Sequence, residues 1–397
     1  MLGLHMGPNI SAHAAAALAD LDLPYARRIL YELTEAHLLE HSASHNYQFH
    51  DLLRVYANEQ VCGEESEGDR RAAVRRLLEW YLHAGVTLKR QLGNSAAQLR
   101  PDPPVPRNPI AFVSSARARS WLEVEIPNLV AVTRQASEMH FEEFAWKIPD
   151  SGLSSPYVPP SERVGVYRIG LEAARRVADR NGEGRMLLNL GESLDRVDRI
   201  SESIECLRSC LAISLETGDR EQEAWALNNL GADHIQLGKL AEAVDYACRA
   251  LVIWCDLGYP RPQGVSLGNL GKAYMGLGRI DDCCECLDRA ERIFDEVGDR
   301  WRLAWIWLER ANIMRVQGNS VEALVLYGQA LDVNREMGDR VYEAHCLRGM
   351  GQVMFNSGDI PGAQNCWRQA LVIYSDIWLP GVADVNDDLR RTCAEDG

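Results

Sequence analysis

The chain has 397 residues, and 42 lysines and arginines against 57 aspartates and glutamates give it a formal net charge of −15. A hydrophobic content of 46% is ample for buried cores and excludes global disorder. The acidic balance argues against a polyanion-binding surface, because affinity for nucleic acid comes largely from clustered Lys and Arg. With no secretory signal, no apolar stretch near the roughly 20 residues of a membrane helix, and eleven irregularly spaced cysteines, we expect a cytoplasmic protein with reduced thiols and no membrane partner.

Residues 1–62 predict a small helical module. Helical periodicity covers residues 11–18, 24–39 and 50–60, and the polar, His- and Ser-rich residues 40–49 predict a hairpin. The order helix, helix, hairpin, helix is typical of a winged-helix module. Three arginines face seven carboxylates in this segment, so phosphate would be repelled and direct DNA binding is disfavoured.

Histidines are concentrated in the same segment. His37, His41 and His45 follow a four-residue spacing that would place three imidazoles on one helix face. The spacing crosses Ser42-Ala43-Ser44, where the helix should already have ended. We therefore expect solvated hairpin histidines and no metal site.

Residues 63–178 are predicted to connect this module to the rest of the chain. An acidic loop leads into an amphipathic helix, over residues 63–92, that carries Arg70, Arg71, Arg75 and Arg76. These arginines could bind phosphate, but such a run is more often a solvated helix face.

Prolines are predicted to interrupt the helices in the second half of this connector. Five of them between residues 101 and 109 predict a stiff extended linker. A helical pair over residues 115–147 should kink or break at Pro127, because proline removes a donor and clashes with the preceding turn. Residues 147–161 are rich in Pro, Ser and Gly and predict a loop, which leaves a repeat-like pair at 127–178 undecided.

A 40-residue period governs the sequence from residue 179 onward. Gly218-Asp219-Arg220 recurs as Gly298-Asp299-Arg300 and Gly338-Asp339-Arg340, and Asn189-Leu190-Gly191 recurs at 229 and 269. Small residues form two further rows. The pattern predicts two antiparallel helices per unit, crossing at the small residues, with a left-handed glycine at Gly238, Gly278, Gly318 and Gly358. Five units should cover residues 179–378, followed by a capping helix and tail at 379–397.

A cluster of thiols falls inside this repeat. Cys283-Cys284-x-Cys286 could be a metal or redox site, but Cys283 lies in a small-residue row and Cys286 shares a column with Cys206 and Cys366. Packing as small hydrophobes is therefore the favoured interpretation.

Spacing suggests no catalytic triad, paired carboxylates or activated cysteine, and we expect a non-enzyme without cofactor or metal. Stacked helix pairs form a concave groove lined by the first helix of each unit, and that groove is the usual binding surface. The repeat phase predicts these groove-facing residues: Arg185, Asn189, Trp225, Asn228, Asn229, Ile235, Asn269, Lys272, Trp305, Asn312, Arg315, His345, Arg348 and Gln352.

Two groups of these residues have alternative roles. The asparagine row at 189, 229 and 269 could hold the backbone of an extended peptide, since an amide both donates and accepts, or could bond one helix to the next. Trp225 and Trp305 could be binding anchors or could pack against the neighbouring unit.

Two family resemblances accompany these patterns. The order Trp/Leu-x-x-Leu-Gly-x-x-Tyr, then Ala, then Ala, resembles the tetratricopeptide repeat (TPR), with longer helices than the usual 34-residue form. Several strings are similar to actinobacterial antibiotic-regulatory-protein-type (SARP, AfsR-like) transcriptional regulators, in which a winged-helix subdomain closes an NB-ARC nucleotide switch and a TPR array follows. The strings are Leu2-Gly3-Leu4-His5, Ala36-His37-Leu38-Leu39-Glu40, Phe49-His50-Asp51-Leu52-Leu53-Arg54, Trp121-Leu122-Glu123 and Val166-Tyr167-Arg168.

The resemblance implies a role for one histidine. Phe49-His50-Asp51 matches the NB-ARC Met-His-Asp motif at two of three positions, and the family's histidine contacts the β-phosphate of ADP. The chain lacks a G-x-x-x-x-G-K-[S/T] loop, so it should not bind ADP alone, and His50 would sense nucleotide only with a switch domain. Otherwise His50 caps the last helix and packs against the hairpin.

The patterns support one leading function and one alternative. The leading hypothesis is the sensory or interaction arm of a transcriptional regulator, with a protein or peptide in the groove and a nucleotide-switch domain in cis or in trans. The alternative is a free-standing peptide-signal receptor or scaffold. A resemblance that begins within a motif at Met1 predicts a fragment, a split gene or a misplaced start.

Overall fold

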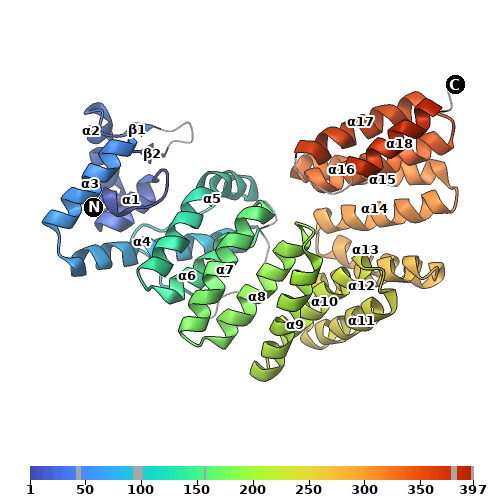
Figure 1. The fold of residues 1–397 in the computed structure, drawn as a ribbon, viewed down its shortest axis with the longest axis horizontal. Coiled ribbons are helices and arrows are strands. Elements are labelled where there is room, and N and C mark those ends of the chain that lie inside the picture. The colour runs from blue at the N-terminus through green and yellow to red at the C-terminus, as the bar shows by residue number, and fades with distance from the viewer. Residues whose placement is uncertain (42–45, 93–101, 156–157, 377–381, 395–397) are drawn as a thin grey trace. The chain divides into compact units, whose positions relative to one another are not determined.

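A computed structural model describes residues 1–41, 46–92, 102–155, 158–376 and 382–394 (Figure 1). These residues are helical apart from loops and a two-stranded hairpin, and none of their helices is long and apolar enough to cross a membrane. The chain forms two compact units, Met1–Gln222 and Glu223–Gly397. The boundary between them lies inside the repeat array, and the four-part domain organisation stays a prediction.

The first 64 residues contain the predicted succession of elements. The elements are the 3-10 turn η1 (Leu2–Leu4), α1 (Ala12–Ala19), α2 (Leu23–Glu35), β1 (Glu40–His41), β2 (Tyr47–Gln48) and α3 (Asp51–Glu64). The strands pair antiparallel, and Ile10 bridges to Tyr47. Ser11 and Asp22 start the two helices where the sequence indicates, because their side chains accept from backbone N–H groups three residues on.

The spaced histidines do not share a helix. The second helix was predicted to reach residue 39 but ends at Glu35, and His37 has a φ of +56° beyond its end. His41 lies in β1, and His45 falls outside the described residues. In the described part of the chain, no group of three or more His, Cys, Asp or Glu side chains could hold a metal ion.

The arginine-rich helix α4 (Glu67–Gln91) uses its arginines to hold other helices. Arg70 donates to Cys62 and Glu65 at the end of α3, and Arg71 donates to Met139 and His140 at the end of α5 (Ser115–Glu138). Arg76 donates to Ala17 and Leu18 at the end of α1. Helix C-termini carry unpaired carbonyls and partial negative charge, so three of the four arginines are internal caps rather than a purely solvated face.

The structure narrows one expectation about prolines and corrects another. α5 is continuous through Pro127, so a break is excluded and a kink stays a prediction. The predicted loop from residue 147 is instead helix up to residue 152, because α6 (Glu142–Gly152) contains Pro149. Trp146 and Ile148 of α6 are buried. Burial of that apolar face outweighs the local preference of proline for a helix end.

The 40-residue repeats form the predicted helix pairs. Helix α7 (Pro160–Arg176) precedes them, and α18 (Val382–Ala394) follows. The pairs are α8 (Arg180–Asp195) with α9 (Ile200–Thr217), α10 (Arg220–Gln236) with α11 (Leu240–Leu257), α12 (Pro260–Gly276) with α13 (Ile280–Glu296), α14 (Arg300–Val316) with α15 (Ser320–Met337), and α16 (Arg340–Asn356) with α17 (Ile360–Asp376).

The turns and crossings have the predicted geometry. Gly238, Gly278, Gly318 and Gly358 all take positive φ angles, between +70° and +83°. The alanine rows are buried at the crossings, and Ser203 donates to the Gly191 carbonyl at 2.9 Å. A Cβ at Gly191 would lie 2.8 Å from the Leu207 side chain, so the glycine permits this close approach.

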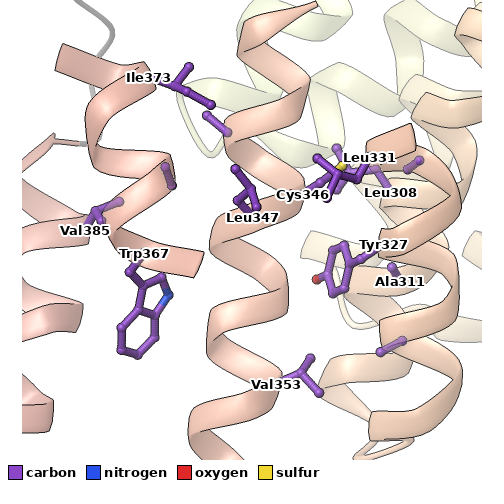
Figure 2. Close-up of a cluster of buried hydrophobic side chains, with 14 of the residues drawn as sticks. Leu308, Ala311, Tyr327, Leu331, Cys346, Leu347, Val353, Trp367, Ile373 and Val385 are labelled. Carbon is purple, nitrogen blue, oxygen red and sulfur yellow. The ribbon is translucent and has the colours of Figure 1, made fainter. Parts of the chain in front are cut away.

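The last two repeats share one apolar core, drawn in part in Figure 2. Tyr327 of α15, Leu347 of α16, Trp367 of α17 and Val385 of α18 belong to it, and each is at most 2% exposed. Because Val385 contributes to this core, α18 packs against the last helix pair, and its role as a cap stays a prediction.

Candidate functional site: a polar face on the first helices

The first helices of successive repeats lie side by side in the Glu223–Gly397 unit. α12 contacts α14, and α14 contacts α16. Residues 40 positions apart therefore come into register on one surface. We call it the α12–α14–α16 face and define it by Lys272, Trp305, Glu309, Asn312, Arg315, His345 and Arg348.

Glu309 is the acceptor at the centre of this face. It lies 3.3 Å from the Lys272 ammonium, accepts from Trp305 Nε1 at 3.2 Å, and accepts from Asn312 Nδ2 at 3.5 Å. The half-buried Trp305 ring packs on α12, where a Cβ at Gly268 would come within 2.2 Å of it, so the predicted alternative of packing against the neighbouring unit is observed for this ring. Sequence reasoning missed Glu309, although it occupies the column of the predicted asparagine row.

Tyr327 and Arg315 continue the network from Asn312. The Tyr327 hydroxyl donates to Asn312 Oδ1 at 2.7 Å, and its ring fits beneath α16 because Gly349 has no side chain. Burial raises the pKa of Tyr327 to about 12, although Arg315 acts to lower it. The phenol is therefore a neutral donor at physiological pH.

His345 lies where α16 meets α17. Its Nδ1 lies 2.9 Å from the Tyr374 hydroxyl, and its ring meets Tyr342 edge to face. Burial of the ring lowers the pKa of His345, and the positive charges of Lys272 and Arg348 lower it further. Glu309 and Asp339 act in the opposite direction but do not reverse the shift. The histidine is thus neutral at physiological pH.

Arg348 already forms ion pairs with helix α18. Its Nη1 lies 3.1 Å from Asp384 and its Nε 3.3 Å from Asp388, both on α18. Its side chain is 33% exposed, while that of Asp388 is 6% exposed. Reversing the charge at Arg348 would therefore disturb the cap, and this residue is no clean probe of ligand binding.

Two asparagines of this unit take the predicted helix-to-helix role, and the peptide-holding role stays a prediction for Asn229. Asn228 and Asn269 are buried, and Asn269 Nδ2 donates to Asn228 Oδ1 at 3.2 Å, so they bond α10 to α12. Asn229 is half-buried on α10, and Gln352 is half-buried on α16. Trp225 packs edge to face on Trp254 of α11, with ring centroids 5.2 Å apart, which is the packing alternative.

The two predicted site residues of the Met1–Gln222 unit face a buried carboxylate. Asp150 on α6 is 2% exposed; Arg185 donates to its Oδ2 at 2.9 Å and Asn189 to its Oδ1 at 3.0 Å. Lys89 of α4 lies 3.6 Å from the same carboxylate. Arg185 and Asn189 therefore tie α8 to α6 and α4, a correction to their placement in an open groove.

His50 is accessible but not a side-chain cap. It occupies the position before α3 without a capping bond, its Nε2 lies 2.7 Å from Glu40 of the hairpin, and its side chain is 67% exposed. Nearby Arg54 donates to the carbonyls of Gly7 and Pro8 at 2.7 Å, and these bonds hold the N-terminal segment against α3.

A buried polar cluster lies beneath this segment. Glu125 of α5 is 1% exposed and accepts from Asn46, Tyr81 and Asn128 at 3.0, 3.1 and 2.8 Å. His5 Nε2 lies 3.3 Å from the Tyr81 hydroxyl. Burial raises the pKa of Glu125 against these hydrogen bonds. The sequence pattern did not predict this cluster, because Asn46 and Tyr81 lie far from Glu125 along the chain.

His5 should make the unit acid-sensitive. Burial, with Arg54 nearby, lowers the pKa of His5 to about 3, whereas the unfolded chain takes up the proton near 6.5. The stabilisation is complete above pH 6.5 and is lost as the pH falls toward 3, by about 2 kcal/mol between pH 7 and pH 5. Urea unfolding at both values should show a smaller difference for His5→Gln, whereas His140→Asn, at an exposed histidine, should keep it. Equal pH dependence in His5→Gln and the parent would contradict this.

The cysteines follow the packing interpretation. Cys283 and Cys286 are 1% and 8% exposed, and burial raises their pKa to about 12 and about 11. Both stay protonated near neutral pH, whereas a reactive or metal-binding cysteine needs its thiolate.

Comparison with known proteins agrees with the repeat assignment. Two family models, each described as tetratricopeptide repeat, match residues 171–255 and 265–295. Regulatory protein AfsR of Streptomyces coelicolor is 30% identical over 226 residues, which are 54% of this chain and 22% of AfsR. Regulatory protein AfsR of Streptomyces griseus is 37% identical over 142 residues, 34% of this chain and 14% of that protein. The chain thus spans less than a quarter of these relatives.

Two solved structures share the fold. A Rap protein complexed with competence and sporulation factor has a TM-score of 0.51 at 11% identity, covering 97% of this chain and 99% of that one. The Rap conjugation gene regulator of plasmid pLS20, in complex with the Phr* peptide, has a TM-score of 0.50 at 13% identity, covering 89% and 96%. The tetratricopeptide repeats and the similarity to AfsR regulatory proteins predicted from the sequence are confirmed.

Proposed function

We propose that this chain is a non-enzymatic protein- or peptide-binding module, the interaction arm of a cytoplasmic transcriptional regulator. The observation that carries the proposal is the α12–α14–α16 face, where an indole, amides, a histidine and cations gather on adjacent first helices. Side-chain amides can pair with a peptide backbone, and tryptophan is a common binding anchor. The Rap conjugation gene regulator of the same fold, solved in complex with the Phr* peptide, supports a peptide as ligand.

Residues 1–62 form the second part of the proposal. They would dock on a nucleotide-switch domain, in cis or in trans, and His50 would contact a phosphate of its nucleotide. The 67% exposure of His50 leaves its ring available for such a contact. The chain by itself supplies no phosphate-binding loop, so any ADP would be held by that other domain.

Substituting Trp305 tests the binding face. Peptides selected with the full chain from a random dodecapeptide library would be labelled with fluorescein and their Kd measured by anisotropy. Trp305→Ala should raise Kd at least about 30-fold, as expected for loss of an aromatic hot spot worth about 2 kcal/mol. Val252→Ala, at an exposed apolar position of α11, is the control and should leave Kd unchanged.

Two outcomes would reject this assignment. Selection of no peptide by the parent chain would remove peptide binding itself, and undiminished affinity in a folded Trp305→Ala variant would move the site elsewhere. Circular dichroism establishes the folding of each variant.

The His50→Ala variant distinguishes the hypothesis of a regulator arm from that of a free-standing receptor. In a regulator, the variant should keep the peptide Kd but change the output of a reporter gene, because only the coupling to the switch domain is altered. In a free-standing receptor or scaffold, neither quantity should change.

A further inference from the structure

We propose that the α12–α14–α16 face selects an extended peptide with acidic side chains. This inference rests on the proposed function and adds the chemistry of its ligand. In this proposal, the cations of the face pair with acidic side chains of the peptide, and its amides form hydrogen bonds with the peptide backbone. Trp305 packs against an apolar side chain of the peptide.

The first argument is the local charge. The whole chain carries −15, but the face presents Lys272, Arg315 and Arg348 against one carboxylate of its own, Glu309. Lys272 is paired with Glu309, and Arg348 with α18. Among the described residues no carboxylate forms an ion pair with Arg315, whose contact is the Tyr327 hydroxyl. One positive charge on this face is therefore left for a ligand.

The second argument is the response of His345 to its surroundings. Burial is the main reason that its pKa is lowered. Four charged groups also act on the ring: Lys272 of α12 and Arg348 of α16 disfavour its protonation, whereas Glu309 of α14 and Asp339, just before α16, favour it. Beside the ring lie two aromatic groups: Tyr342 meets it edge to face, and the Tyr374 hydroxyl lies 2.9 Å from its Nδ1. An apolar aromatic surface therefore adjoins the cations of the face.

The third argument is that the face already binds an acidic segment. Asp384 and Asp388, one helical turn apart on α18, place their carboxylates 3.1 and 3.3 Å from the Arg348 guanidinium. Charge-assisted bonds of this kind are stronger than neutral ones. Arg315 offers the same chemistry on the neighbouring first helix, on the same face as Asn312 and Gln352.

The test reverses the charge at Arg315 and compares the peptides that each variant selects from a library. A random dodecapeptide library with amidated C-termini would be selected on the full chain and on Arg315→Glu. The parent should enrich Asp and Glu, and Arg315→Glu should reverse the preference toward Lys and Arg. Individual acidic peptides should bind Arg315→Glu at least about 10-fold more weakly and Arg315→Gln to an intermediate degree. Arg289→Glu, at an exposed position on α13, should match the parent.

The outcomes separate this inference from the function beneath it. Neutral or basic peptides that are lost in Trp305→Ala would overturn the acidic preference and leave peptide binding intact. Absence of any selected peptide would overturn both. If acidic peptides bind only with a free C-terminal carboxylate, or if polyglutamate or single-stranded DNA competes equally, the face recognises general negative charge and the proposal fails. Concentration-dependent dimerisation abolished by Arg315→Glu would assign the face to a second copy of the chain instead.

Discussion

Replacing Asp150 with asparagine should lower the free energy of unfolding of the Met1–Gln222 unit by about 3–5 kcal/mol. Asp150 is 2% exposed, and Arg185, Asn189 and Lys89 all point at its carboxylate. The substitution keeps the side-chain volume but removes the buried carboxylate that pairs with both Arg185 and Lys89. The cost therefore comes from desolvated charge rather than from a cavity.

The matched control is Glu79→Gln in the same unit. Glu79 forms an exposed ion pair with Arg75 at 3.0 Å, and its loss should cost no more than about 0.5 kcal/mol. Urea unfolding measures both variants, and adding Lys89→Met to Asp150→Asn should recover part of the loss, since one buried cation is removed. Similar values for Asp150→Asn and Glu79→Gln would contradict the buried-charge argument.

The same carboxylate has a defined pH dependence. Burial would raise the pKa of Asp150, but Arg185 and Lys89 outweigh it and lower the pKa below its ordinary value. Its contribution is therefore present above the unfolded pKa of about 3.9 and disappears as the pH falls through the folded value. Asp150→Asn should lose this acid-range dependence.

Replacing Trp367 with alanine should cost about 3–5 kcal/mol in the Glu223–Gly397 unit. Trp367 is fully buried between α16 and α17, its Nε1 donates to the Arg348 carbonyl at 3.2 Å, and its ring packs on Phe355. It approaches α16 so closely that a Cβ at Gly351 would lie 2.4 Å from Nε1. The cavity cannot be filled by collapse without moving two helices.

Val372→Ala on the same helix is the control, because Val372 is 58% exposed. It should change stability by less than about 0.5 kcal/mol. Hydrogen exchange should show loss of protection in α16 and α17 for Trp367→Ala, while the earlier pair α12 and α13 keeps its protection, since repeats are stabilised by their neighbours. Uniform loss over the whole unit would show instead that its repeats unfold as one.

The sequence by itself determined the repeat architecture. A strict 40-residue period with glycine at the turn of four of the five units, and Asp198 at that of the first, leaves one arrangement of helix pairs. Glycine takes the left-handed conformation freely, and small residues allow close crossings. The bounds of α8 to α17 follow from that phase, and so does the register that brings Lys272, Trp305, Asn312 and His345 to adjacent helices.

The tertiary structure decided which of these positions remain available. Arg185 and Asn189 have the same repeat phase as Trp225 and Asn229, yet α4 and α6 bring Asp150 and Lys89 against them. Arg348 is taken by two aspartates of α18. The period describes only contacts between neighbouring repeats, so elements outside it, α4, α6 and α18, could not be placed from the pattern. Their apolar faces fix where they pack, and their charged side chains then pair with whichever repeat positions lie opposite.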